Sequence, residues 1–192
     1  MNVVAILGSP RPRASSNKLA QRFLDVAASK GAEVDSFILN DLQFIGCQGC
    51  YGCKRVRDVC VIKDDLTPVL SAVEKCDVLV LTSPVYIHDV TGQMKCFIDR
   101  TFSYLTPEFH TSPDNASRLG KGKKLFFLQT QGNPDEKAFS DVPPRYEHFF
   151  KVLGFDVQTM IVAGIGLQEN LLESRPELVK TVEGVAGQML AK

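Results

Sequence analysis

The sequence lacks several features that would assign it to a class at once. Its 192 residues contain no apolar run long enough to span a bilayer and no charged-then-apolar leader, so we expect neither membrane insertion nor secretion. Lysine plus arginine and aspartate plus glutamate number 22 each, which leaves no overall field to recruit nucleic acid or an anionic membrane. Internal repeats, linkers and low-complexity stretches are also missing. We therefore expect one cytoplasmic domain over residues 1–192, with no nucleic-acid or membrane partner.

No nucleophile–base constellation is visible, so we predict no catalytic residue of the acid–base kind. The three histidines, His88, His110 and His148, have no metal-ligand partners at a useful spacing, and we interpret them as surface or packed residues. The composition, 44% hydrophobic and 23% charged, is that of an ordinary globular protein. Any chemistry must therefore come from local motifs or from a bound cofactor.

Strand-like and helix-like segments alternate along the chain. Five β-prone runs alternate with segments of helical periodicity, which predicts an α/β fold with a doubly wound parallel sheet. In such a sheet, ligands bind at the carboxyl ends of the strands, near the point where the strand order reverses. The predicted strands are 3–7, 33–39, 77–82, 124–129 and 156–163, and the predicted helices begin near 18 and span 66–74, 91–105, 143–153 and 173–190.

The first stretch sets the pattern for the rest. The apolar run Val3–Leu7 predicts a buried strand, and a loop rich in Ser, Pro, Arg and Asn leads from Gly8 into a helix. Arg11 and Arg13 lie in this loop, and a helix start presents unpaired N–H groups with a partial positive charge. The loop therefore suits a phosphate monoester. The alternative is an ordinary turn capped by a hydroxyl or amide, for which the candidates are Ser15, Ser16 and Asn17.

Two further loops follow predicted strands at the same sheet edge. The segment 83–95 offers a proline-stiffened backbone and Tyr86, which suit a flat conjugated ring with a polar edge. The segment 129–132 offers amide and hydroxyl groups for the other edge of such a ring. Each loop alone has a plain interpretation as a βα turn, but three of them on one edge favour a ligand site. The loop 163–168 completes this edge.

The cysteine run is the most chemically specific feature of the sequence. Four thiols at this spacing on a glycine-relaxed loop can ligate a 4Fe-4S cluster, and Lys54, Arg55 and Arg57 would offset its negative charge. Structural zinc and free thiols are the alternatives, because ligand softness does not separate iron–sulfur from zinc. We expect Cys76 and Cys96 to be small buried hydrophobic residues. The four candidate ligands are Cys47, Cys50, Cys53 and Cys60.

Several motifs in series resemble the NAD(P)H-dependent FMN reductase superfamily, and in particular its iron-sulfur flavoprotein branch. They are Gly-Ser-Pro-Arg at 8–11, the four cysteines, Asp64-Asp65, Ser-Pro-Val-Tyr at 83–86 and Thr-Gly-Gln-Met-Lys-Cys-Phe-Ile-Asp-Arg at 91–100. The resemblance covers roughly residues 1–165 and implies a flavodoxin-like fold, bound FMN and a flavin site near a subunit interface.

The resemblance also implies which residues hold the flavin. Three groups are expected, for the phosphate, the ring and the far side of the ring. They are Ser9, Arg11, Ser15, Ser16 and Asn17 for the phosphate, Pro84, Val85 and Tyr86 for the ring, and Gln129, Thr130, Gln131 and Gly132 for its far side.

Two charged pairs are interpreted as structural. Asp64-Asp65 is expected to cap the helix that begins at Leu66, where negative charge is favourable. Asp99 and Arg100 are adjacent on a predicted helix, where neighbouring residues do not face each other, so we do not expect them to form an ion pair.

Together these features predict an FMN-dependent electron-transfer oxidoreductase that passes electrons between FMN, a 4Fe-4S cluster and a one-electron carrier such as ferredoxin. The first alternative is an NAD(P)H-dependent FMN, quinone or nitro-compound reductase without a cluster. The second is a flavodoxin-like carrier, against which the 106–122 insertion speaks, since a carrier has no need to shield the ring. We expect a homodimer or homotetramer, with that insertion at the contact.

Overall fold

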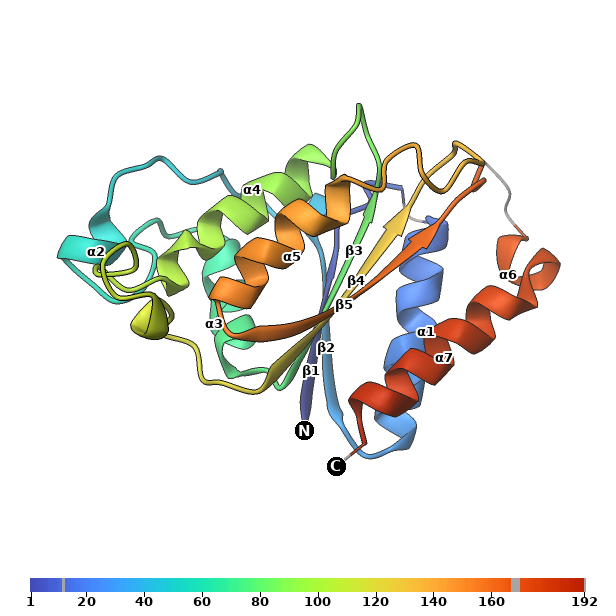
Figure 1. Ribbon diagram of the computed structural model, residues 1–192, viewed down its shortest axis with the longest axis horizontal. Helices are drawn as coiled ribbons and strands as arrows, with labels where there is room; N and C mark the ends of the chain where they lie inside the picture. Colours follow the sequence, from blue (N-terminus) through green and yellow to red (C-terminus); the bar gives the residue numbers. More distant parts are fainter. Residues whose placement is uncertain (12, 167–169, 192) are drawn as a thin grey trace.

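The computed structural model describes residues 1–11, 13–166 and 170–191. Its five strands form one parallel sheet in the order β2-β1-β3-β4-β5, so the chain reverses direction across the sheet between β1 and β3 (Figure 1). This confirms the predicted doubly wound α/β fold with a flavodoxin-like strand order. The strands are β1 (Asn2–Leu7), β2 (Glu33–Ile38), β3 (Val78–Pro84), β4 (Lys123–Thr130) and β5 (Phe155–Val162).

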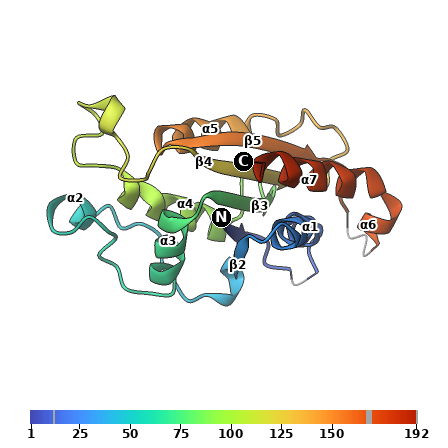
Figure 2. The same cartoon turned by 90° about the horizontal axis from the view of Figure 1, so that it is seen from below.

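The central strands are apolar because both of their faces are covered. Every residue of β3 is buried, and so is β1 after Asn2, whereas the edge strands β2 and β5 have exposed positions. Figures 1 and 2 show α1 and α7 on one face of the sheet and α3, α4 and α5 on the other. The helices are α1 (Ser15–Ser29), α2 (Gly52–Arg55), α3 (Leu66–Lys75), α4 (Gly92–Arg100), α5 (Val142–Val152), α6 (Leu171–Ser174) and α7 (Pro176–Met189), with 3₁₀ turns at Leu39–Asp41, Thr101–Tyr104 and Pro113–Asn115.

Each face of the sheet has its own hydrophobic core. Phe23 of α1 stacks on Phe126 of β4 on one side, with ring centroids 5.5 Å apart. On the other side, Phe127 meets Tyr146 of α5 edge to face at 6.0 Å. Successive residues of β4 thus supply opposite cores, as the two-residue period of a strand requires.

The predicted helix 91–105 is shorter than expected. α4 ends at Arg100, and the chain continues as the 3₁₀ turn Thr101–Tyr104. Around this turn, Phe102 O and Leu105 O accept hydrogen bonds from Lys54 Nζ at 2.6 and 2.7 Å. A side chain from a distant segment thus binds carbonyls that lack intrahelical partners near a helix end.

The predicted helix 173–190 is two helices, because Pro176 cannot continue a helix from the preceding turn. It occupies the first position of α7, where its missing N–H is no loss. No helix in the described ranges is long and apolar enough to cross a membrane.

Candidate functional site

Three loops meet where the strand order reverses. The N–H of Gly8, at the end of β1, donates to Thr82 O of β3 at 2.8 Å, and the N–H of Val85, after β3, donates to Thr130 O of β4 at 2.8 Å. The loops predicted to hold a flavin therefore follow adjacent strands at one sheet edge. Of the loop 163–168, which was expected to complete this edge, 167 and 168 lie outside the described residues.

Position 8 requires glycine, because neighbouring atoms lie too close to its backbone for a side chain. A Cβ atom there would lie 2.9 Å from Thr82 O and 3.0 Å from a Met94 methyl carbon, so no side chain fits. The Thr91 hydroxyl donates to Gly8 O at 2.7 Å and accepts from Met94 N at 3.2 Å. Thr91 therefore caps α4 and fixes its N-terminus against the β1 loop.

The start of α1 differs from the prediction. The predicted caps Ser15, Ser16 and Asn17 lie inside the first turn, and the N-cap is Ala14, which has no side-chain acceptor to offer. The first-turn N–H groups thus have no side-chain cap. The Nδ2 atom of Asn17 is buried and has no hydrogen-bond partner. An uncapped helix start with an unsatisfied buried donor fits an anion such as a phosphate.

The other phosphate candidates lie in the same loop. Ser9 is buried, and its hydroxyl accepts from Arg11 N at 3.3 Å, while the Arg11 side chain is exposed. Ser15 and Ser16 are buried at the start of α1. The five residues expected around a phosphate thus lie on one loop and the first turn of α1, and their role stays a prediction.

The β3–α4 loop is a tight, strained turn. Tyr86 and Asp89 exchange backbone hydrogen bonds at 2.8 and 3.1 Å, while Ile87 and His88 between them have φ of 44° and 64°. These left-handed conformations are costly for side chains other than glycine. The turn is tied to α5 by Tyr146, whose hydroxyl donates to Asp89 at 2.6 Å. Burial and this acceptor raise the pKa of Tyr146.

The ring candidates Pro84, Val85 and Tyr86 lead into this turn, and Tyr86 is exposed. His88 is also exposed, and its ring meets the Phe139 ring edge to face at 5.0 Å, which confirms the interpretation of a surface or packed histidine. His110 and His148 are likewise exposed.

The end of β4 contributes buried amides. Gln129 Nε2 donates to Gln131 Oε1 at 3.1 Å and to Phe139 O at 3.2 Å, while Gln129 Oε1 is buried without a partner. Thr82 Oγ1, at the end of β3, is a second buried oxygen without a partner. Thr130 and Gln131 are buried and Gly132 is exposed. Buried polar atoms without a hydrogen-bond partner are rare in folded proteins. Among the described residues, these two oxygens lie at the predicted ligand edge.

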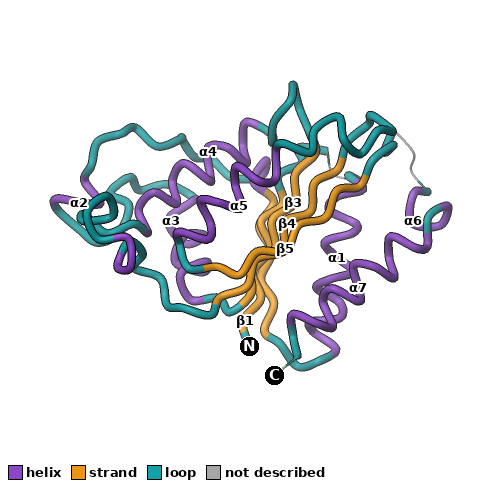
Figure 3. Tube along the Cα trace, in the orientation of Figure 1, coloured by secondary structure: helices purple, strands orange, loops and turns teal. Residues whose placement is uncertain are grey.

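The cysteine loop, residues 41–64, extends past the sheet and is irregular except for its 3₁₀ start and α2 (Figure 3). Cys47 and Cys50 are exposed, Cys53 is buried and Cys60 is half-buried, yet all four line one small cavity. Cys60 also borders a larger cavity of about 230 Å³, whose wall includes Tyr104 and Arg118.

The described residues contain no group of three or more His, Cys, Asp or Glu side chains placed to hold a metal ion. The four thiols nonetheless line one cavity, so the structure groups these donors without assigning a metal to them. Four soft donors of this kind suit a 4Fe-4S cluster or a zinc ion.

Sequence reasoning missed the importance of Arg100, which is buried at the end of α4. Its Nε donates to Cys60 Sγ at 3.1 Å and its Nη1 donates to Asp64 Oδ2 at 2.7 Å. Arg100 does not pair with Asp99, as expected, because Asp99 pairs instead with Lys95 one turn away. The only sequence signal was an arginine ending an otherwise amphipathic helix.

The expected cap at Asp64-Asp65 is only partly correct. Asp64 Oδ1 accepts from Leu66 N at 3.1 Å, but the N-cap Asp65 makes no cap bond and accepts from Gln43 N at 2.7 Å. Burial raises the pKa of Asp64, but the hydrogen bonds from Arg100 and from Ile45 N outweigh it, so that the pKa is lowered overall.

Two more cations lie beside the cysteines. Lys54 follows Cys53, and burial lowers the pKa of its ammonium against the opposing effect of the Cys53 thiol. Arg118, in the 106–122 insertion, donates to Cys53 O at 3.0 Å and pairs with Asp58 at 3.1 Å. The predicted neighbour Arg55 is exposed and lies over the Tyr51 ring at 5.7 Å. Positive charge therefore lies next to the cysteines, partly from residues remote in sequence.

The remaining cysteines differ from each other. Cys76 is fully buried, as expected, and burial raises the pKa of its thiol to about 11. Cys96 was expected to be buried but is half-exposed, because it lies on the side of α4 that faces Gly46 of the cysteine loop.

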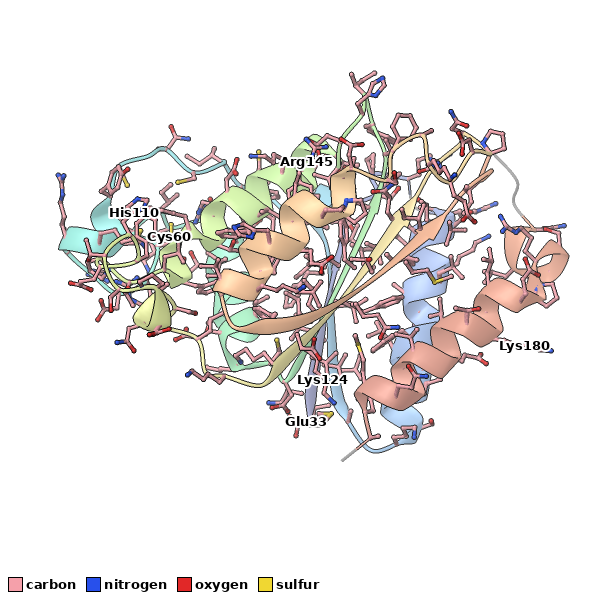
Figure 4. The ribbon with its side chains drawn as sticks, in the orientation of Figure 1. Glu33, Cys60, His110, Lys124, Arg145 and Lys180 are labelled. Carbon is pink, nitrogen blue, oxygen red and sulfur yellow. The ribbon has the colours of Figure 1, made fainter. Side chains whose placement is uncertain are left out.

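The flavin loops and the cysteine loop lie at opposite ends of α4. Thr91 contacts the β1 loop and Arg100 contacts Cys60, and the nine residue steps from one to the other span about 13 Å of helix rise. In Figure 4, Cys60 lies at the left with the insertion, whereas Arg145 lies by the β3–α4 turn. The cysteine loop thus contacts α4 from Cys96 to Arg100, toward its C-terminal end.

The fold and the site define a flavodoxin-like α/β protein with a ligand site at its strand-order reversal. Residues 1–136 match the family described as NADPH-dependent FMN reductase, and the chain belongs to that family.

Relatives with curated names include an iron-sulfur flavoprotein of Archaeoglobus fulgidus, 38% identical over 104 residues, which are 54% of this chain and 47% of that protein. An iron-sulfur flavoprotein of Methanocaldococcus jannaschii is 36% identical over 101 residues, 53% of this chain and 52% of that protein. The chain thus spans about half the length of the curated relatives it matches. These matches confirm the resemblance to iron-sulfur flavoproteins.

Solved structures with the same fold include an NAD(P)H:quinone oxidoreductase from Methanothermobacter marburgensis, with a TM-score of 0.74 and 14% identity over 100% of this chain and 98% of that one. An FMN-dependent NADH-azoreductase from Bacillus anthracis has a TM-score of 0.71 and 15% identity, with both chains covered completely. They confirm the flavodoxin-like fold.

Proposed function

We propose that this chain is an FMN-dependent oxidoreductase that exchanges electrons between a flavin at the switch point and a 4Fe-4S cluster in the cysteine loop. One observation supports the proposed cluster most directly. A single cavity, with Arg100 in its wall, is lined by Cys47, Cys50, Cys53 and Cys60. A one-electron carrier such as ferredoxin is the expected partner, and NAD(P)H a possible co-substrate.

The flavin part is supported by the residues at the switch point. The uncapped start of α1, with Asn17 Nδ2 unsatisfied, would bind the phosphate, and Arg11 would add charge-assisted hydrogen bonds. Gln129 Oε1 would accept an N–H from the ring edge. Bound FMN would supply hydride acceptance and single-electron release, which side chains cannot perform.

The cluster part is supported by the donor set. Four thiols in one cavity can ligate a cluster, and Arg100 and Lys54 would offset its negative charge. A bound cluster would supply one-electron exchange with a carrier protein. The half-exposed Cys60 and the exposed Cys47 and Cys50 leave that end of the molecule open to such a carrier.

The second candidate is an NAD(P)H-dependent FMN, quinone or nitro-compound reductase in which the cysteines stay free thiols. The exposure of Cys47 and Cys50 favours it, as does the lack of a metal-ion grouping in the described chain. The 106–122 insertion does not decide against the carrier alternative, because Arg118 ties it to the cysteine loop and not to the flavin loops.

The test is Cys53→Ser in protein made anaerobically with ample iron and sulfide. Replacing the soft ligand with a hydroxyl should remove iron and acid-labile sulfide while FMN is retained, because Cys53 lies outside the flavin loops. Electron exchange with a one-electron carrier should collapse, whereas direct hydride transfer to FMN should survive. Cys76→Ser is the control, since this buried thiol does not line the cavity. A wild-type protein that is yellow, not brown, with little iron would support the second candidate instead.

We also propose that the chain assembles at least as a dimer. Because the two sites lie toward different ends of α4, a second chain could bring its flavin site next to the cysteine loop. Exposed apolar residues on the cysteine loop, Ile45, Tyr51, Val56 and Val59, are consistent with a contact there. Light scattering at micromolar concentration measures the assembly, and a monomeric mass would refute it.

A further inference from the structure

Arg100 makes every hydrogen bond that its guanidinium can donate. The group has five N–H donors, and five acceptors receive them. Nε bonds to Cys60 Sγ at 3.1 Å, Nη1 to Ile45 O at 2.9 Å and Asp64 Oδ2 at 2.7 Å, and Nη2 to Ile62 O at 3.3 Å and Asp64 Oδ1 at 3.2 Å. With a fully buried side chain and no spare donor, the guanidinium has one orientation.

These acceptors lie near both ends of the cysteine loop. Ile45 precedes the first of the four cysteines and Ile62 follows the last, so Arg100 links the two ends of the loop. Asp64 strengthens this link between the two ends of the loop, because it also accepts hydrogen bonds from Ile45 N at 3.3 Å and from Leu66 N at 3.1 Å. The segment between Cys53 and Cys60 is mostly exposed. The position of Cys60 therefore depends on the contacts that Arg100 makes at the two ends of the loop.

We propose that Arg100 is the positioning residue of the four-cysteine site, which holds Cys60 as the fourth ligand and raises the reduction potential of the bound cluster. The inference rests on the proposed cluster. Reduction adds one electron from the flavin or from an added reductant and no proton, so negative charge at the ligand sulfurs increases. The Nε–H of the buried Arg100 donates to Cys60 Sγ, and this hydrogen bond stabilises the added negative charge.

The other two cations have different partners. Lys54 Nζ is bonded to Phe102 O and Leu105 O and also interacts with the Cys53 thiol, whereas Arg118 is bonded to backbone carbonyls and Asp58. Arg100 is the cation that donates to Cys60 Sγ, at 3.1 Å, and its side chain is fully buried. Its removal should therefore affect the Cys60 sulfur itself.

The experiment compares wild type with Arg100→Lys and Arg100→Gln after anaerobic reconstitution with iron and sulfide. Lysine keeps the charge but has three donors in place of the planar five, and glutamine loses the charge as well. Midpoint potentials are measured by redox titration with spectroscopic detection. We expect the potential to become more negative from wild type to lysine to glutamine, with FMN content unchanged. Lys95→Gln is the control, an exposed charge on the same helix that should shift nothing.

Equal potentials in all three proteins would overturn the inference, as would a loss of iron with an unchanged potential in the clusters that remain. If both Arg100 variants fail to fold, Asp64→Asn tests the positioning, because it loosens the guanidinium while keeping Arg100. Its cluster should lose iron to a chelator faster than wild type, and an equal rate would refute the role. Wild type without iron would instead refute the proposed function, so the two failures are distinguishable.

Discussion

The two ends of α4 are stabilised in different ways. At its N-terminal end, the three ligand loops are fixed mainly through backbone groups, such as Gly8 N to Thr82 O and Val85 N to Thr130 O, which continue the ladder of the sheet. At its C-terminal end, the cysteine loop has no sheet to join and is held by the side chains of Arg100, Asp64, Lys54 and Arg118. The first site thus tolerates loss of single side chains better than the second.

Asp64→Ala should have the largest effect, because it leaves the buried Arg100 charge without its partner. Breaking a buried ion pair in this way costs about 3–5 kcal/mol of the free energy of unfolding. Denaturant titration of the protein measures it. Asp99→Ala is the matched control, since the Lys95–Asp99 pair is exposed and is worth less than about 1 kcal/mol. Similar costs for the two variants would remove the contrast between the ends of α4.

Arg11→Ala should act on ligand affinity with little effect on folding. Loss of a charge-assisted hydrogen bond to the phosphate should weaken FMN binding by about 1.5–3 kcal/mol, a factor of roughly ten to over one hundred. Fluorescence titration of FMN against the apoprotein measures this. Arg22→Ala, an exposed position further along α1, should leave the affinity unchanged. Unaltered binding in the Arg11 variant would exclude this residue from the site.

Ile87→Asn should stabilise the protein, because asparagine tolerates the left-handed conformation better than a β-branched residue. The Ile87 side chain is 93% exposed, so little packing is lost, and we expect a gain of about 1 kcal/mol. Thermal unfolding measures the gain. Val56→Asn provides the comparison, an exposed position with φ of −116° where no strain is relieved. If both variants unfold at the wild-type temperature, the turn stores no strain.

The smallest expected effect is on acid stability. The folded state lowers the pKa of Asp64, so the unfolded state binds its proton more readily, and stability rises with pH across that range. The contribution is complete above the ordinary aspartate pKa of about 4 and is lost as pH falls through the lower folded value. Asp64→Asn should flatten this part of a plot of unfolding free energy against pH. An unchanged slope would mean that Asp64 does not titrate differently in the two states.

The fold followed from patterns that a sequence displays directly. Alternating strand and helix periodicities gave the five-stranded parallel sheet, and its ligand edge followed from the rule for strand ends. Helix ends were less predictable. α4 stops at Arg100 and a 3₁₀ turn follows, whose carbonyls bind Lys54 about fifty residues away in the sequence. The domain organisation, cytoplasmic location and partners stay predictions, as do the roles of the site residues.

The sequence by itself determined which groups are available: the phosphate-type loop after β1, the polar ends of β3 and β4, and four cysteines in one run. These signals are local, since short-range spacing sets the face, strand or loop on which a residue lies. The tertiary structure decided how the groups meet. Arg100 is forty residues from Cys60, and their contact depends on α4 crossing beside the cysteine loop, which no local pattern encodes. The same geometry places the two sites at opposite ends of α4, because a helix fixes the distance between its ends.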